Sequence, residues 1–174
     1  RPSVRALSAL QDLLQRLGPA PDLITLLNDL LASTLAVVGA SDGSLLLVDE
    51  ESGDLVFAVV LGEARDRLSG YHLPPGQGIA GWVALNRQGQ IVHDVHADPR
   101  FYPDIDEMFG FHTRTLACVP LLDGNRVLGV IEAINKTSDR AFTEQDSELL
   151  TVVAQLASIA ISRAETLSEP PNPA

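Results

Sequence analysis

The stretch RVLGVIEAINKTSDRAFTEQD, residues 126–146, reads as an apolar strand that leads into the start of a helix. Glu132 interrupts the apolar run VLGVIEAI near its centre. A carboxylate is rarely buried without a partner, because taking its charge out of water is costly. The surroundings of this one side chain therefore decide what the strand does in the fold.

A second apolar strand, residues 114–122, comes just before this one along the chain. Asp123, Gly124 and Asn125 join the two strands, and this turn chemistry is typical of a tight β-hairpin. Farther on, Thr143 and Asp146 match a helix capping box, and Lys136 is placed to form an ion pair with Asp146.

The pleat of the hairpin predicts what Glu132 faces. Successive side chains of a strand point to opposite faces, so Glu132 is expected to share a face with Thr113 and Thr115. Cys118 is expected on the opposite, wholly apolar face, packed under a terminal helix. An apolar face with two hydroxyls and a carboxylate suits a ligand cavity. Two alternatives stay open: Glu132 pairs with Arg114, or it reaches solvent at a sheet edge.

The rest of the chain supplies helices at both ends and further strands between them. The predicted elements are helices at 3–17 and 23–38, strands at 43–48 and 55–60, a short helix at 79–86, strands at 91–95, 114–122 and 126–134, and a helix at 144–167. Residues 62–70 read as a polar surface loop. This order predicts an α+β domain with a central, mainly antiparallel sheet.

The composition and the first residue of the chain limit the class of protein to which it can belong. The chain has 174 residues and a net charge of −11, which argues against nucleic acid or an anionic membrane as its main partner. Its longest apolar runs, 31–40 and 152–161, are shorter than the ~18 residues of a membrane span. A first residue other than Met predicts a piece of a longer protein: a helix or linker at 1–20, one domain at 21–166 and a Pro-rich tail or linker at 167–174.

Two motifs point to ligands less directly. GQGIAG, residues 76–81, matches G-x-G-x-x-G but follows two prolines instead of a strand, so we expect no dinucleotide site. The amides of Ile79 and Ala80 could hold a phosphate at a helix start, or could simply form a turn. His93 and His96 would point to opposite faces of a strand, so no metal is expected. The single Cys118 permits no intrachain disulfide and suits a reducing cytoplasm.

Several segments together resemble a known family. GSLLLVD (43–49), GQGIAGWVALNRQGQIVHDV (76–95), DPRFYPDID (98–106), GFHTRTLACVPL (110–121) and GVIEAINK (129–136) resemble GAF domains, the regulatory modules of phosphodiesterases, adenylyl cyclases, phytochromes and bacterial sensor kinases. The resemblance implies a sheet of about six strands, terminal helices on one face and a pocket, roofed by loops and a helix, on the other.

The resemblance also implies a set of pocket residues. With Thr115 added from the strand pattern, the predicted ligand-binding residues are Ser44, Ile79, Ala80, Asp106, Phe111, Thr113, Thr115 and Glu132. Phe109 and the pair Leu61-Gly62 depart from the family's usual contact residues for a purine. A cyclic nucleotide is therefore expected to bind weakly or not at all, and the ligand is left as an unspecified small molecule.

The function that the resemblance implies is signal transduction. We expect a non-catalytic sensory module that binds a small molecule, forms a homodimer through its terminal helices and controls a covalently attached output domain. The alternatives are a ligand-free dimerisation scaffold and a redox enzyme like the free methionine sulfoxide reductases, which use cysteines.

Dimerisation is expected because the last helix is apolar on two sides. One stripe would cover the sheet and the other would be exposed in a monomer, which soluble helices avoid. The alternative is that the helices pack on each other within one chain. The two stripes are Leu149, Val153, Leu156 and Ala160, and Leu150, Ala154, Ala157 and Ile161.

Overall fold

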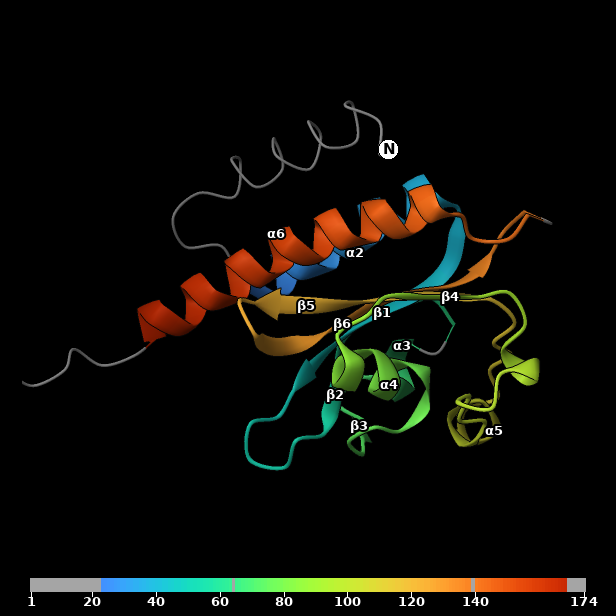
Figure 1. The fold of residues 1–174 in the computed structure, drawn as a ribbon, viewed down its shortest axis with the longest axis horizontal. Helices are drawn as coiled ribbons and strands as arrows, with labels where there is room; N and C mark the ends of the chain where they lie inside the picture. Colours follow the sequence, from blue (N-terminus) through green and yellow to red (C-terminus); the bar gives the residue numbers. More distant parts are fainter. Residues whose placement is uncertain (1–22, 64, 139, 169–174) are drawn as a thin grey trace, which may run out of the picture.

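A computed structural model describes residues 23–63, 65–138 and 140–168 of the chain (Figure 1). The predicted helix at 3–17 and the tail beyond residue 168 lie outside the described residues. The described elements are α2 (Leu23–Val38), β1 (Ala40–Val48), β2 (Leu55–Leu61), α3 (Arg65–Leu68), β3 (His72–Leu73), α4 (Gly78–Asn86), β4 (Gln90–Val92), the 3₁₀ turn η1 (Val95–Ala97), α5 (Asp104–Phe109), β5 (Leu116–Asp123), β6 (Arg126–Lys136) and α6 (Glu144–Ser168).

The six strands form one open, antiparallel sheet in the order β3-β2-β1-β6-β5-β4. The predicted α+β class and the six-stranded antiparallel sheet are therefore confirmed. β1 and β6 are the two central strands, and Ser44 of β1 lies directly opposite Glu132 of β6. Residues 62–70, expected to be a polar loop, contain the short helix α3, and the short edge strand β3 follows them.

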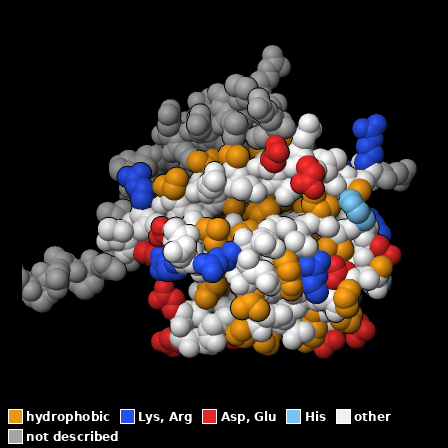
Figure 2. Space-filling view, in the orientation of Figure 1, with side chains coloured by type: hydrophobic (Ala, Val, Ile, Leu, Met, Phe, Trp, Pro, Cys, Tyr) orange, Lys and Arg blue, Asp and Glu red, His pale blue; other side chains and the backbone are white. Residues whose placement is uncertain are grey.

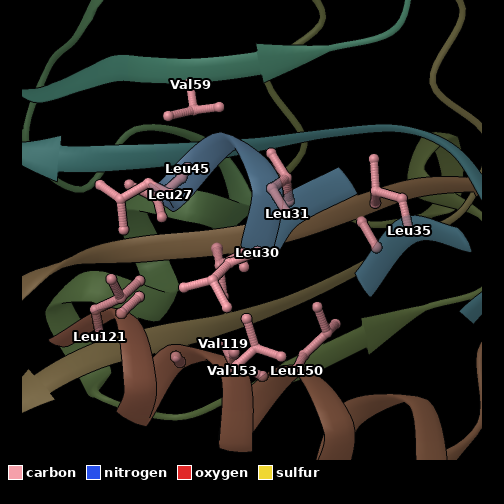
Figure 3. Close-up of a cluster of buried hydrophobic side chains, with 14 of the residues drawn as sticks. Leu27, Leu30, Leu31, Leu35, Leu45, Val59, Val119, Leu121, Leu150 and Val153 are labelled. Carbon is pink, nitrogen blue, oxygen red and sulfur yellow. The ribbon is translucent and has the colours of Figure 1, made fainter. Parts of the chain in front are cut away.

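Helices α2 and α6 lie side by side over one face of the sheet (Figure 1). Leucines spaced along α2 meet apolar side chains of α6 and of the strands, and this packing forms the larger buried core (Figure 3). Its fully buried members include Leu27, Leu30 and Leu31 of α2, Leu150 and Val153 of α6, and Val119 and Leu121 of β5. Burial of one such side chain contributes about 1.5–3 kcal/mol, so this layer anchors the sheet.

The opposite face carries a second apolar cluster, over which α4, α5 and the loops around them form a roof. Val83 of α4 and Val95 of η1 are fully buried there against Leu46 and Val130 of the central strands. The predicted strand at 91–95 is shorter than expected, because Asp94 accepts a hydrogen bond from the amide of His96 and starts η1.

The hairpin of β5 and β6 corrects the predicted faces. Asp123 pairs with Arg126 around a two-residue turn, but the register shifts by one residue between Leu121 and Leu122. A bulge of this kind exchanges the faces of all later residues on one strand relative to the other. Cys118 therefore lies directly opposite Glu132 and belongs to the roof-side cluster. The prediction that Cys118 packs under a terminal helix is wrong.

Helix α6 is covered more fully by its own chain than its two apolar stripes predicted. Leu149 and Val153 of one stripe are buried in the core shared with α2 and the sheet, and so are Leu150 and Ala154 of the other. Leu156 and Ala160, the other two members of the first stripe, are partly buried against the same core. Among the α6 residues whose exposure is described, the exposed large apolar side chain is Ile159, which belongs to neither stripe and is 59% exposed.

Candidate functional site

Glu132 lies in the interior of the protein, in the middle of a central strand. Only 5% of its surface is exposed, and Oε1 accepts a hydrogen bond of 2.7 Å from Oγ of Ser44 on the neighbouring strand. Neither an ion pair with Arg114 nor exposure at a sheet edge describes this position, so both alternatives are wrong. The carboxyl group instead faces the space under the roof.

The surroundings of Glu132 favour its neutral form. Burial raises the pKa of the carboxyl group, the hydrogen bond from Ser44 lowers it and the charge of Asp106 raises it, with a net result of about 7. This carboxyl group therefore changes its charge near neutral pH, in contrast to an ordinary glutamate.

A cavity of about 90 Å³ separates Glu132 from the roof. Its wall combines the roof-facing side of β1, β2 and β6 with the start of α4 and the segment 101–113. The lining residues are Asp42, Gly43, Ser44, Phe57, Val60, Leu61, Leu68, Leu73, Gly78, Ile79, Ala80, Phe101, Tyr102, Ile105, Asp106, Phe111, Thr113, Leu116, Glu132 and Ile134. A mostly apolar wall with a few polar groups is typical of a small-molecule site.

Seven of the eight predicted site residues line this cavity, and one does not. Ser44, Ile79, Ala80, Asp106, Phe111, Thr113 and Glu132 meet there. Thr115 instead lies beside a separate surface groove, where its hydroxyl accepts a hydrogen bond of 3.0 Å from the amide of Lys136. The register shift that moves Cys118 also puts residue 115 on the other face, whereas Thr113 still reaches the cavity because it lies before the start of β5 at Leu116.

Asp106 fastens α5 to the segment that leads into β5. Its two carboxylate oxygens accept hydrogen bonds of 2.7 and 2.8 Å from the amide and the hydroxyl of Thr113. α5 is only six residues long, so this pair of bonds fixes where the helix sits over the cavity. The geometry gives Asp106 a structural part in closing the cavity, whatever else it contacts.

The end of β6 is organised by two consecutive residues, Asn135 and Lys136. Asn135 adopts a φ of 58°, and its side-chain oxygen accepts hydrogen bonds from the amides of Arg114 and Thr115 while its nitrogen donates to the carbonyl of His112. These bonds hold the segment that carries Thr113 against the sheet.

Lys136 ties the same strand end to α6. Its ammonium group pairs with Asp146, as the sequence predicted, and lies 5.6 Å from the ring centre of Phe142. Asp146 also accepts a hydrogen bond from the amide of Thr143 and donates its own amide to the Thr143 hydroxyl. The predicted capping box is confirmed.

The glycines of GQGIAG have structural reasons of their own. Gly76 and Gly78 have φ values of +73° and +71°, which favour glycine, and a Cβ on Gly81 would lie 2.5 Å from the carbonyl carbon of Gly76. The motif thus shapes a tight entry into α4. That entry brings Ile79 and Ala80 to the cavity wall.

Cys118 is fully buried beside Glu132, and the pKa of its thiol is raised well above the ordinary value by burial and then by the charge of Glu132. A thiol without access to solvent and with a raised pKa is a poor nucleophile. The described part of the chain holds no cluster of three or more metal-ligating side chains, and no described helix is long and apolar enough to cross a membrane.

Sequence reasoning missed part of the cavity wall. Asp42 precedes Ser44 by two residues on the same strand, so the period of two could have found it. Asp42 also explains the glycine at position 62, which departs from the family pattern. A Cβ on Gly62 would lie 1.8 Å from Oδ1 of Asp42, so there is no room for a larger side chain. Phe57, Leu68 and Leu73 come from segments whose place over the cavity no local pattern signals.

Comparison with known proteins agrees with this architecture. A family model for the GAF domain matches residues 22–161. A probable 3',5'-cyclic phosphodiesterase, pde-5 of Caenorhabditis elegans, is 31% identical over 138 residues, which cover 74% of this chain and 19% of that protein. The dual 3',5'-cyclic-AMP and -GMP phosphodiesterase 11A of Takifugu rubripes is 37% identical over 95 residues, 53% of this chain and 10% of that protein. The chain thus spans a fifth or less of these relatives.

Solved structures share the fold at low sequence identity. The GAF domain of a phosphoenolpyruvate-protein phosphotransferase from Coxiella burnetii has a TM-score of 0.80 at 19% identity, over 93% of this chain and 95% of that one. A free methionine-R-sulfoxide reductase from Neisseria meningitidis, solved with its substrate, has a TM-score of 0.76 at 22% identity, over 96% of both chains. The same fold therefore occurs in a domain of a phosphotransferase and in a reductase.

Proposed function

Because the chain belongs to the GAF domain family, we propose that it is a sensory module that binds a small molecule in the cavity beside Glu132 and controls an attached output domain. The observation that carries this proposal is a carboxyl group, 95% removed from solvent, that faces an apolar cavity with one hydrogen-bond donor from the protein. Burial of such a group is unfavourable for stability alone, so a role in recognition explains its presence.

We propose that the module is not catalytic. A reductase of the methionine sulfoxide type needs an accessible thiol, whereas Cys118 is the single cysteine of this chain and is buried under the roof. The fold of the Neisseria meningitidis reductase therefore supports a small-molecule cavity in this fold, not the same chemistry here.

A ligand-free scaffold is the second candidate, and the small size of the cavity favours it. At about 90 Å³ the cavity is smaller than an engineered cavity of ~150 Å³ that binds benzene. The buried carboxyl group speaks against the scaffold, since an unused pocket would be more stable if it were filled by apolar side chains.

Dimerisation through the helical layer is part of the proposal. Ile159 of α6 and Leu122 at the end of β5 are exposed apolar side chains that border one surface groove. α6 also continues past the end of β5 (Figure 1). It is 25 residues long, with a rise of ~1.5 Å per residue along its axis. A second copy packed along this groove would cover both side chains and place two α6 helices together, next to the output domain that we expect beyond them.

Native mass spectrometry of the protein as purified tests ligand binding. The proposal expects a retained small molecule that is lost from Ala80→Leu, because Ala80 lines the cavity and the larger side chain would fill it. Ala84→Leu, on the same helix but outside the cavity wall, is the matched control and should keep the molecule. A retained molecule with equal occupancy in both variants would place the site elsewhere.

A further inference from the structure

The charges on the cavity wall have one sign. Asp42, Asp106 and Glu132 all line it, and among the described side chains of the wall there is no Lys, Arg or His. Acidic side chains also gather over α5 on the outside of the roof (Figure 2), where the first turn carries Asp104 and Glu107 beside Asp106. An anion that enters the cavity would therefore meet carboxyl groups without a compensating cation.

The three carboxyl groups differ in how far the protein satisfies them. Both oxygens of Asp106 accept hydrogen bonds from Thr113, and Asp42 accepts from the amide of Glu63 and from the hydroxyl of Ser41. Glu132 accepts a single bond, from Ser44 to Oε1, and no other described residue donates to its carboxyl group. Oε2 of Glu132 is thus the acceptor in the cavity that is left for a ligand.

Aromatic rings complete the wall. Phe57, Phe101, Tyr102 and Phe111 all border the cavity. Aromatic rings attract cations electrostatically through their π faces, most strongly when the site is shielded from water. Carboxyl groups and aromatic rings around a small apolar space are the surroundings in which an ammonium group is stabilised.

The start of α4 favours an anion in the cavity, but more weakly than the carboxyl groups favour a cation. The helix places Gly78, Ile79 and Ala80 at the wall, and a helix N-terminus acts as about half a positive charge. Three carboxyl groups outweigh that half charge. The wall therefore favours a ligand of net positive charge.

We propose that the cavity binds a small organic cation, a compact apolar molecule whose ammonium or amidinium group donates a hydrogen bond to Oε2 of Glu132. This inference rests on the proposed function, because it names the ligand class of the same cavity. The volume of about 90 Å³ suits a molecule of roughly four non-hydrogen atoms, since a cavity of ~150 Å³ holds the six of benzene, and this is well below the size of a nucleotide.

The protonation state of Glu132 should make the affinity for a cation depend on pH. Ser44 of β1, Cys118 of β5 and Asp106 of α5 lie around it, Asp42, Tyr102 and Thr113 line the same cavity, and its pKa is raised to about 7. A cation pairs with the ionised carboxylate, so its binding must release the proton that Glu132 carries below pH 7. The affinity for a cation should therefore rise by about tenfold from pH 6 to pH 8, whereas that for a neutral ligand should not.

Three probes with a three-carbon chain and different charges test the inference: propylammonium, propan-1-ol and propanoate. Their dissociation constants can be measured by NMR titration of the chain at pH 6 and pH 8. We expect the ammonium probe to bind at least tenfold more tightly than the carboxylate probe at pH 8, with the alcohol between them. Equal or tighter binding of the carboxylate would overturn the inference.

Variants assign the effect to Glu132. Glu132→Gln should weaken ammonium binding at pH 8 at least tenfold and abolish its pH dependence, while alcohol binding changes little. Glu107→Gln removes the same charge from an exposed position on α5 outside the cavity wall and should leave all three affinities within about twofold. Ammonium binding that is unchanged in Glu132→Gln would contradict the inference.

The outcomes separate this inference from the proposed function. Tight binding of the carboxylate, or of the alcohol alone, contradicts a cationic ligand and leaves a ligand-binding module in place. Binding of none of the three probes also contradicts the inference. If native mass spectrometry then finds no retained molecule either, the proposed function fails with it.

Discussion

Ser44 Oγ donates a hydrogen bond of 2.7 Å to Oε1 of Glu132, across the two central strands of the sheet. The two residues are directly opposite each other although 88 positions apart in the chain. One neutral donor stabilises the carboxylate less than burial destabilises it, which is why the pKa of Glu132 is raised to about 7.

The raised pKa of Glu132 should make the stability of the protein depend on pH. Between about pH 4.5, the ordinary pKa, and pH 7 the folded state binds more protons than the unfolded state, so the free energy of unfolding falls as pH rises. The contribution of Glu132 is fully present below pH 4.5 and is lost above pH 7, by roughly 3 kcal/mol in total. Glu132→Gln should gain stability relative to the parent protein by this amount between pH 4.5 and pH 8, as measured by chemical denaturation. The same difference at every pH would show that the carboxyl group is not buried as described, and Glu107→Gln serves as the exposed control.

The bonds between Asp106 and Thr113 should hold the roof closed. Asp106→Ala removes both, and because hydrogen bonds to a charged acceptor contribute about 1.5–3 kcal/mol, we expect a loss of that order in the free energy of unfolding. Thr113→Val removes only the hydroxyl donor and should cost less. Hydrogen exchange should become faster at α5 in Asp106→Ala, while the α2 and α6 amides stay protected. Uniform acceleration over the whole domain would mean that Asp106 does not act locally.

Asn135 combines a left-handed backbone with three side-chain hydrogen bonds, and the two contributions can be separated. Asn135→Gly keeps access to the φ of 58° and loses the hydrogen bonds to residues 112–115. Asn135→Ala loses both and should be less stable than the glycine variant by about 1 kcal/mol, since a Cβ disfavours the left-handed region. Thermal unfolding of the two variants measures the difference. Equal stabilities would show that the hydrogen bonds alone explain the residue.

These residues also show how far the sequence could be interpreted. The turn residues of the β5–β6 hairpin and the capping box at Thr143 have local chemistry, so both were predicted correctly. Glu132 was placed on the cavity face because alternation within one strand is reliable. Cys118 and Thr115 were misplaced because a bulge at Leu121 and an irregular segment before Leu116 change the register. Such features are set by packing against the rest of the sheet, and a single sequence carries no local signal for them.

The exposure of the apolar stripes of α6 was predicted wrongly for a related reason. Two apolar stripes on α6 suggested one buried and one exposed face, but α2 lies beside α6 and both stripes are covered within the chain or partly so. The helix periodicity identified which residues are apolar, whereas the position of a helix more than a hundred residues earlier in the chain decided which of them are exposed.

Dimerisation is therefore best tested at Ile159. Light scattering should give twice the single-chain mass of 18.6 kDa at tens of micromolar for the parent protein. Ile159→Glu should yield the single-chain mass without loss of stability, because the side chain is 59% exposed within one chain. Leu85→Glu, at an exposed position on α4 on the other side of the sheet, should leave the dimer intact. A parent protein at the single-chain mass would contradict the dimer.

The central claim is that a small molecule binds in the cavity between Glu132 and the roof, and isoleucine methyl NMR tests it most directly. Ile79, Ile105 and Ile134 line the cavity, whereas Ile24 and Ile159 are exposed on the helical layer and report on non-specific binding. With propylammonium at pH 8, we predict saturable shifts of the three cavity methyl signals, their loss in Ala80→Leu, and no change at Ile24 and Ile159. Cavity signals that stay unmoved up to millimolar probe, or shifts that persist in Ala80→Leu, would contradict it.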